Sequence, residues 1–221
     1  MKLDITNYLP LTILVTNTHL AGGVDPLVSI VADAIDGGIN AVQLREKTMD
    51  YSRQLDLASQ LRQVTHDRAL LFINSELEIA QIVGADGIQI PESGIIQIEE
   101  MTEYHENMYF GCSVHSIEAA ESAISHGADF LIAGTIFRSP SHEETTGLGV
   151  TLIEKSVQRA KIPVVGIGGI NPANAAEVIY SGAAGVAVIS EIIQASDPQA
   201  TAAELVRIVN NSWNSRFNPD D

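Results

Sequence analysis

The sequence predicts an α/β fold, a single (β/α)8 TIM barrel, and three observations carry this prediction. Short runs rich in Val and Ile alternate with longer segments of helical period, which is typical of βαβ units. Eight such units follow one another at intervals of roughly 17 to 33 residues, enough for one strand and one helix each. Hydrophobic residues make up 45% of the 221 residues and aromatic residues only 5%, which fits the aliphatic core of a parallel sheet.

Eight strands are expected from the apolar runs, and no linker divides residues 1–221 into two domains. The strands are predicted to begin near Thr12, Ala41, Leu70, Gly87, Tyr109, Phe130, Pro163 and Gly185. A doubly wound open sheet is the alternative, because it also alternates strands and helices. Eight units favour closure, and Val15-Thr16-Asn17-Thr18 stands where the dinucleotide-binding open sheet has G-x-G-x-x-G.

Capping residues and glycines mark the expected ends of several helices. Asp25-Pro26 predicts the start of a helix that ends at Gly37, and Asn171-Pro172 predicts a later one that closes at Gly182. Ser116 predicts the N-cap of a third helix, between the fifth and sixth strands. The polar residues from about 212 to 221 predict a frayed C-terminal tail.

The charge balance argues against polyanionic partners. Twelve basic residues stand against 28 acidic ones, a net charge of −16 that repels nucleic acids and anionic membrane surfaces. Cys112 is the single cysteine, which excludes an internal disulfide and fits a reducing compartment. The first residues lack a signal-peptide pattern, and no apolar run approaches the roughly 18 residues of a membrane span. We expect a cytoplasmic protein without nucleic-acid or membrane partners, and a homo-oligomer is left open.

Polar side chains follow the second predicted strand with a period of two. Gln43, Arg45 and Lys47 alternate with Val42 and Leu44, which directs all three polar side chains toward the inside of the barrel. Burying an arginine and a glutamine without partners costs several kcal/mol. The pattern therefore predicts either a bound ligand at the barrel mouth or an internal ion pair with an acid such as Glu46.

The seventh and eighth strands end in segments typical of phosphate sites. Gly168 and Gly169 follow the seventh strand, Ile189 and Ser190 follow the eighth, and each pair leads into a helix. Glycine lets backbone amides approach an anion, and the helix dipole favours negative charge there. Barrels commonly bind phosphate after these two strands. A tight strand-to-helix turn also requires glycine, but the position in the seventh unit favours a phosphate site.

Two reactive residues lie on or after the fifth strand, and one long loop follows the sixth. His115 directly follows the fifth strand, where an imidazole could accept and release a proton. Cys112, two positions before Val114, is expected to pack in the core. The polar stretch 137–147 could be a mobile lid or a plain surface loop.

Together these segments resemble one family, in order and in spacing. The motifs are QLREK at 43–47, FIN at 72–74, GADG at 84–87, SVHS at 113–116, SPS at 139–141, GIGGI at 166–170 and VIS at 188–190. Across about residues 12–195 the chain resembles the thiamine phosphate synthase superfamily. The resemblance implies a TIM barrel that acts on thiazole phosphate in thiamine biosynthesis.

The superfamily contains two activities, and departures from the synthase pattern decide between them. Synthases join a pyrimidine diphosphate to thiazole phosphate with Mg²⁺, whereas TenI-type proteins aromatise a thiazole phosphate precursor by moving a proton. Ser75 and Gly94 stand where the synthases carry their two metal-binding carboxylates. Gln89 replaces a histidine, and His142 replaces the lysine that binds diphosphate. These losses favour a thiazole tautomerase, an isomerase that needs no cofactor.

The resemblance also implies roles for individual residues. His115 and Lys47 are the expected catalytic residues; His115 carries the proton, and Lys47 holds the substrate carboxylate together with Arg45. The expected substrate-binding residues are Gln43, Arg45, Asn74, Gln89, Ser139 and Ser141, and the expected phosphate-binding residues are Gly168, Gly169, Ile189 and Ser190. No metal ligand is expected.

Two other functions remain open on the same residues. Lys47 and the Ser139-Pro140-Ser141 segment are retained from the synthase pattern. Glu76 or Glu92 could supply a displaced carboxylate for Mg²⁺, which would make the chain a thiamine phosphate synthase. The second possibility is a non-catalytic protein that binds thiazole phosphate or thiamine phosphate.

Overall fold

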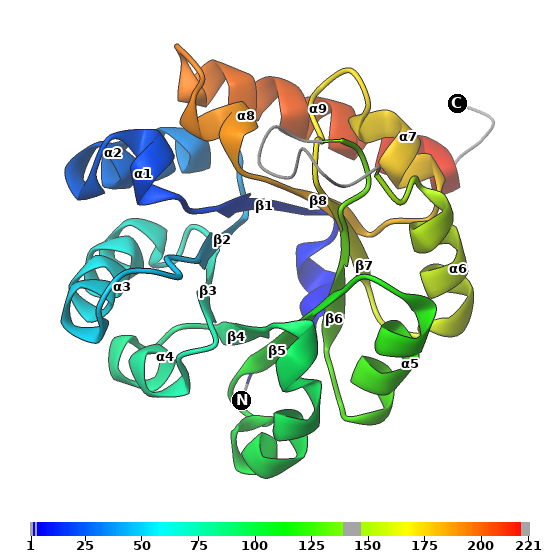
Figure 1. Cartoon of the computed structure of the whole chain (residues 1–221). Helices are drawn as coiled ribbons and strands as arrows, with labels where there is room; N and C mark the ends of the chain where they lie inside the picture. The colour runs from blue at the N-terminus through cyan, green and yellow to red at the C-terminus, as the bar shows by residue number, and fades with distance from the viewer. Residues whose placement is uncertain (1, 3, 139–146, 218–221) are drawn as a thin grey trace.

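The computed structural model describes residues 2, 4–138 and 147–217 and shows a closed parallel barrel (Figure 1). Its strands pair in the order β1 to β8, and β8 pairs again with β1. The strands are β1 (Leu11–Val15), β2 (Ala41–Leu44), β3 (Leu70–Asn74), β4 (Gly87–Ile90), β5 (Tyr109–Val114), β6 (Phe130–Gly134), β7 (Val164–Ile167) and β8 (Gly185–Val188). The predicted fold is confirmed, and each strand begins within one residue of its predicted start.

Helices surround the barrel and connect successive strands. They are α1 (Thr18–Ala21), α2 (Val24–Asp36), α3 (Tyr51–Thr65), α4 (Leu77–Val83), α5 (Ile117–Ser125), α6 (Thr151–Arg159), α7 (Ala175–Tyr180), α8 (Ser190–Ile193) and α9 (Pro198–Phe217). The 3₁₀ helices are η1 (Ile5–Tyr8), before β1, and η2 (Glu92–Tyr104), which takes the place of an α-helix between β4 and β5. In η2 the apolar residues Ile95, Ile98, Met101 and Tyr104 repeat every three positions and pack on the core. Because a 3₁₀ helix has three residues per turn, all four apolar side chains lie on the same side of η2.

The core has two layers, as a barrel requires. Aliphatic side chains fill the space between the strands and the surrounding helices. Inside the barrel, a smaller cluster contains Phe72 and Phe130 with ring centroids 5.1 Å apart. Gly111 makes room for this cluster, because a Cβ there would lie 2.3 Å from the Phe130 ring. Ile5 and Tyr8 of η1 pack against the same cluster, and Tyr8 meets Tyr109 edge to face at the start of β5.

Of the three predicted helix starts, one is confirmed and two are wrong. Ser116 caps α5 by accepting a 3.0 Å hydrogen bond from the Ala119 amide. Asp25 does not cap α2, because the N-cap is Gly23. Asp25 lies in the first turn, where its negative charge interacts favourably with the positive end of the helix dipole.

The predicted start of α7 at Asn171-Pro172 is also too early. The Asn171 side chain accepts from the Ala173 amide, and Asn174 accepts from the Asn171 amide, so both asparagines stabilise a turn. The helix begins only at Ala175 and ends at Tyr180, just before the predicted Gly182.

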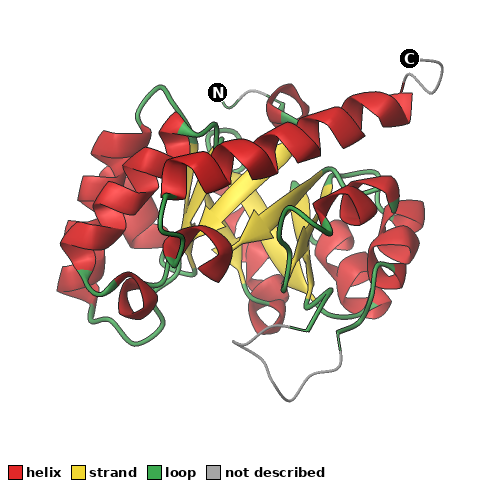
Figure 2. Ribbon diagram, turned by 90° about the horizontal axis from the view of Figure 1, so that it is seen from above, coloured by secondary structure: helices red, strands yellow, loops and turns green. Residues whose placement is uncertain are grey.

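The prediction of a frayed tail from residue 212 is wrong for the described part of the tail. Helix α9 continues to Phe217 and runs as one long helix along the outside of the barrel (Figure 2). Ser212 is only 5% exposed, and the Arg216 guanidinium donates to the carbonyl oxygens of Ile179 and Ala183 at 3.0 and 2.8 Å. These contacts attach the last turns of α9 to the α7–β8 connection.

Candidate active site

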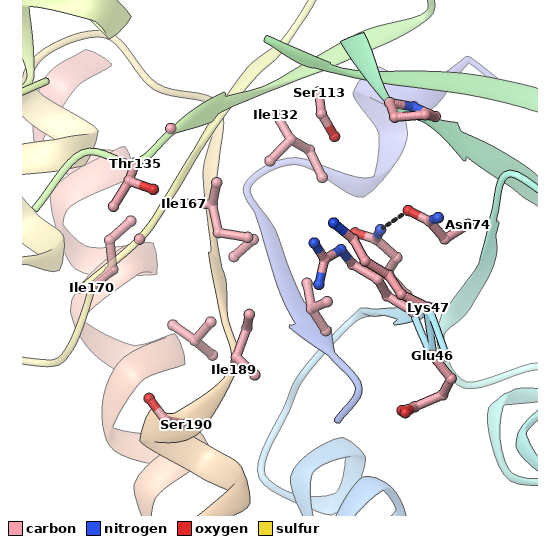
Figure 3. A pocket seen from close by; sticks show the side chains of 18 of the residues that line it. Glu46, Lys47, Asn74, Ser113, Ile132, Thr135, Ile167, Ile170, Ile189 and Ser190 are labelled. Carbon is pink, nitrogen blue, oxygen red and sulfur yellow. Dashed lines mark hydrogen bonds between the residues drawn. The ribbon is translucent and has the colours of Figure 1, made fainter. Parts of the chain in front are cut away.

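A pocket of about 600 Å³ opens at the C-terminal ends of the strands. Such a volume is ordinary for a small-molecule site. Nine of the expected site residues line it, namely Gln43, Arg45, Lys47, Asn74, His115, Gly168, Gly169, Ile189 and Ser190. Figure 3 shows Lys47 and Asn74 on one side of the space, with Ile189 and Ser190 on the other. The fold therefore brings together residues that lie up to about 150 positions apart in the sequence.

The end of β2 supplies the positive charge of the pocket. Burial lowers the pKa of the Arg45 guanidinium, and the charge of Glu46 partly offsets this effect. In the described part of the chain neither Arg45 nor Lys47 forms a salt bridge. The Glu46 carboxylate instead accepts hydrogen bonds from the Thr18 amide and hydroxyl at 3.0 and 2.8 Å. The internal ion pair with Glu46 is thus not formed, and a bound anion would relieve the cost of burying Arg45.

Polar residues at the end of β3 complete this side of the pocket. The Gln43 amide donates to Asn74 Oδ1 at 3.2 Å, the contact drawn at Asn74 in Figure 3. Asn74 in turn donates to the Ser75 hydroxyl at 2.9 Å. Ser75 has a left-handed backbone with φ of 66°, which is uncommon for a residue other than glycine and marks a strained strand end.

The turn after β7 needs both of its glycines. Gly168 and Gly169 have φ values of 103° and 63°, and a Cβ on Gly169 would lie 2.6 Å from the Arg138 carbonyl oxygen. The Gly169 carbonyl accepts from the Asn174 side chain at 2.9 Å, which fixes the orientation of the turn. Among residues 4–138 and 147–217, no acceptor is recorded for the backbone amides of Gly169 and Ile170. These amides can therefore donate to a ligand.

The start of α8 lies across from the cations and contributes further donors. Within the described ranges, the amides of Ser190 and Glu191 have no recorded acceptor, as expected in a first helical turn. Glu191 also lines the pocket, and burial together with the charge of Glu204 raises its pKa. This carboxylate was not anticipated from the sequence, because its approach to the pocket depends on where α8 begins.

His115 lies at the pocket wall in contact with an acid from the preceding connection. Its imidazole Nδ1 is 2.8 Å from Oε2 of Glu92, the first residue of η2. The backbone amide of His115 donates to the same carboxylate oxygen, also at 2.8 Å. The His115 side chain is 61% exposed, so a ligand or solvent can reach the ring. No local pattern indicated this pairing, because Glu92 precedes His115 by 23 positions.

Gln89 does not line the pocket, contrary to the expectation that it contacts substrate. Its side chain is fully buried inside the barrel, and its Nε2 donates to the Ser113 hydroxyl at 3.0 Å. Ser113 does line the pocket, so Gln89 can reach a ligand only through Ser113. Gln89 can adopt this buried position because Gly111 has no side chain; a Cβ there would lie 2.2 Å from Gln89 Oε1.

Cys112 packs in the core as predicted. The residue is fully buried, and burial raises the pKa of its thiol to about 12. Because the thiolate is the reactive form, this cysteine cannot serve as a nucleophile near neutral pH.

The other two expected ligands, Ser139 and Ser141, lie outside the described residues, as does His142. Most of the stretch 137–147, for which a mobile lid and a plain surface loop were both considered, also lies outside the described residues.

The residues around the pocket do not fit a magnesium site of the type implied by the synthase resemblance. In the part of the chain that the structure describes, no three His, Cys, Asp or Glu side chains gather as possible metal ligands. Glu92 accepts a hydrogen bond from the His115 amide and contacts the imidazole Nδ1, and Glu46 accepts two hydrogen bonds from Thr18. Glu76 and Glu191 also line the pocket, but neither belongs to a group of three possible ligands among the described residues, and isolated carboxylates are a poor site without phosphate ligands.

Comparisons with known proteins agree on one family. Residues 12–192 match the family described as thiamine monophosphate synthase (TMP-TENI). A thiamine-phosphate synthase from Pyrococcus furiosus is 39% identical over 186 residues, which cover 83% of this chain and 89% of that protein. A thiamine-phosphate synthase from Moorella thermoacetica is 38% identical over 197 residues, covering 88% of this chain and 93% of that protein.

A solved structure gives the same result. The thiamine phosphate pyrophosphorylase from Pyrococcus furiosus superposes with a TM-score of 0.84 at 35% identity, covering 95% of this chain and 99% of that chain. The two sequence relatives are named thiamine-phosphate synthase and the solved structure thiamine phosphate pyrophosphorylase, so none of the three supports the preference for the tautomerase. Among the helices of the described residues, none is both long and apolar enough to cross a membrane.

Proposed function

Because the chain belongs to the thiamine monophosphate synthase family, we propose that it forms thiamine phosphate from hydroxymethylpyrimidine diphosphate and thiazole phosphate. The observation that supports the proposal is one pocket with donors suited to an anion on two of its sides. The amides of Gly169 and Ser190, which have no acceptor among the described residues, form one side, and Arg45 and Lys47, which have no carboxylate partner in the same ranges, form the other. Two phosphorylated substrates need two such sides. The synthase thereby replaces the tautomerase as our first candidate.

In the proposed reaction the chain supplies charge and position rather than a covalent intermediate. The bond between the pyrimidine methylene carbon and the diphosphate oxygen breaks, and pyrophosphate leaves with the electron pair. The thiazole nitrogen attacks the methylene carbon, and the new C–N bond gives the thiazolium ring of thiamine phosphate. Arg45 and Lys47 would neutralise the charge that grows on pyrophosphate, which is where electrostatic catalysis contributes most. The amides of the β7 and β8 turns would hold the phosphate of the thiazole.

We assign no step to a metal ion, because the described side chains do not provide a carboxylate site for one. An assay for thiamine phosphate from both substrates, run with Mg²⁺ and with a chelator, tests the proposal. Thiamine phosphate together with equimolar pyrophosphate is the expected product. No product under either condition would refute it.

One observation favours a second candidate, the thiazole tautomerase. His115 beside Glu92 resembles an acid–base pair, which proton transfer requires and the synthase reaction does not. In this reaction the proton leaves the ring carbon beside the carboxylate and returns at the exocyclic carbon, which gives the aromatic ring. Incubation with the thiazole carboxylate phosphate precursor in D₂O tests this candidate. Deuterium at the exocyclic carbon supports it if the His115→Asn variant lacks the reaction, and an equal rate in that variant excludes His115 from it.

A further inference from the structure

Glu92 and His115 form a contact that neither the sequence nor the family resemblance indicated. Glu92 Oε2 lies 2.8 Å from the imidazole Nδ1 and 2.8 Å from the backbone nitrogen of His115. One carboxylate oxygen therefore connects the start of η2 to the end of β5 through both the backbone and the ring. We infer that Glu92 is a positioning residue that holds His115 with its proton on Nδ1, so that Nε2 acts as an acceptor toward the substrate.

The chemistry of the carboxylate determines which nitrogen carries the proton. An ionised carboxylate can only accept hydrogen bonds, so the Nδ1 atom beside it must be the donor. In a neutral imidazole the other nitrogen then has the free lone pair. The described residues provide no hydrogen-bond partner for Nε2, and His115 lines the pocket. The same arrangement orients histidines in metal sites and hydrolases, where a carboxylate holds the ring from the far side.

The backbone contact separates this pair from an ordinary surface pair. His66 and Asp67 also bring Nδ1 and a carboxylate together, at 2.9 Å, but their side chains are 69% and 89% exposed. Glu92 is 38% exposed and is further fixed by the His115 amide. Exposed ion pairs contribute little because solvent screens them and side-chain entropy opposes them. The His66–Asp67 pair therefore provides an internal control for the behaviour of a loosely held histidine.

This orientation of His115 restricts which chemical groups of a ligand can lie beside its Nε2 atom. An acceptor at Nε2 suits a substrate that presents a hydrogen-bond donor or an acidic proton at that place. This step rests on the proposed function, since it takes the pocket to be the substrate site. The exocyclic amino group of an aminopyrimidine would provide the donor in the synthase reaction. The acidic C–H of the thiazole precursor would provide the proton in the tautomerase reaction.

Nitrogen-15 NMR of the imidazole rings tests the positioning without any substrate. The ring nitrogens of ¹⁵N-labelled protein would be assigned at about pH 8.5, where an ordinary imidazole is neutral. The wild type is expected to show the Nδ1–H tautomer at His115. Glu92→Gln should preserve it, because the amide oxygen can also accept, whereas Glu92→Ala should release the ring to a mixture dominated by Nε2–H. Asp67→Ala should leave His115 unchanged. An Nε2–H tautomer in the wild type, or no change in Glu92→Ala, would overturn the inference.

Kinetics then connects the positioning to the reaction. Loss of a residue that orients a catalytic group typically costs about 10- to 100-fold, so Glu92→Ala should lower kcat by that factor with a smaller change in KM. Glu92→Gln should recover most of the loss. In the His115→Asn background, Glu92→Ala should have no further effect, since residues that act through one another are not additive. A full additional loss there would show that Glu92 acts independently of His115. If no activity is found, the proposed function fails, while the tautomer result still decides the positioning.

Discussion

The charged side chains at the two ends of the barrel differ in whether they have partners of opposite charge. At the N-terminal end, Asp129 accepts from the Phe110 amide at 2.7 Å and pairs with Lys2 at 2.6 Å. Asp86 repeats the arrangement with the Leu71 amide at 2.7 Å and Arg62 at 2.8 Å. At the C-terminal end, Arg45 and Lys47 have no carboxylate partner among the described residues.

The difference shows how the barrel separates stability from binding. A buried charge with a partner and a satisfied backbone amide joins neighbouring strands and adds stability. A partly buried charge without a partner costs stability and is retained where a ligand can pair with it. Substitutions at the N-terminal end should therefore reduce stability and leave binding intact, whereas those at the mouth should do the reverse.

The largest effect is expected at the mouth, from Arg45→Met. Removing this cation takes away charge neutralisation of the departing diphosphate, and kcat/KM should fall about 10²- to 10³-fold. The melting temperature should stay the same or rise, because the change removes a partly buried cation that has no carboxylate partner in the described ranges. Steady-state kinetics measures kcat/KM, and scanning calorimetry measures the melting temperature. Arg53→Met, at a surface arginine that is 79% exposed, is the matched control and should change neither quantity.

The next largest effect is expected at the opposite end, from Asp129→Ala. This change leaves the Phe110 amide without its acceptor and the Lys2 ammonium with the Met108 carbonyl but without its carboxylate partner, which should cost about 2–3 kcal/mol of unfolding free energy. Asp129→Asn keeps an acceptor oxygen and should lose less. Urea unfolding gives the free energies, and substrate affinity should be unaltered. A loss of affinity equal to that of Arg45→Met would contradict the separation of the two ends.

The smallest effect is expected from Ser190→Ala at the start of α8. The hydroxyl would provide one hydrogen bond to the phosphate in addition to the backbone amides, so binding should weaken about 3- to 10-fold. Stability should be unchanged. Ser215→Ala, where the hydroxyl only bonds to the Asn211 carbonyl within α9, is the control for isothermal titration calorimetry. Equal affinities in the wild type and Ser190→Ala would remove the side chain from the phosphate site.

The strands and most of the pocket could be predicted because both follow from periodicity. Gln43, Arg45 and Lys47 reach the pocket since alternate residues of a strand face the same side. The last turns of α9 were missed because the polar residues from 212 on predicted a tail, although Ser212 is buried and the Arg216 guanidinium donates to the carbonyl oxygens of Ile179 and Ala183. These contacts form only in the closed barrel, so a local sequence pattern does not predict them.

Other parts of the site depend on contacts that no local pattern encodes. Gln89 has the strand position expected of a pocket residue. Its side chain instead occupies the space beside Gly111 and donates to the Ser113 hydroxyl. The Glu92–His115 pair depends on η2 beginning at Glu92, a 3₁₀ helix where an α-helix was expected. The choice between the two reactions could not be made from motifs, since the departures at Ser75 and Gly94 favour one activity and the relatives carry the name of the other.

The β7 and β8 turns should bind the phosphate of a thiazole phosphate at the mouth of the barrel. Titration calorimetry with thiazole phosphate and with the unphosphorylated thiazole alcohol tests this claim most directly. Charge-assisted hydrogen bonds from the amides of Gly169 and Ser190 should make the phosphorylated ligand bind about 10- to 100-fold more tightly. Equal affinities for the two ligands, or no binding of either, would contradict the claim.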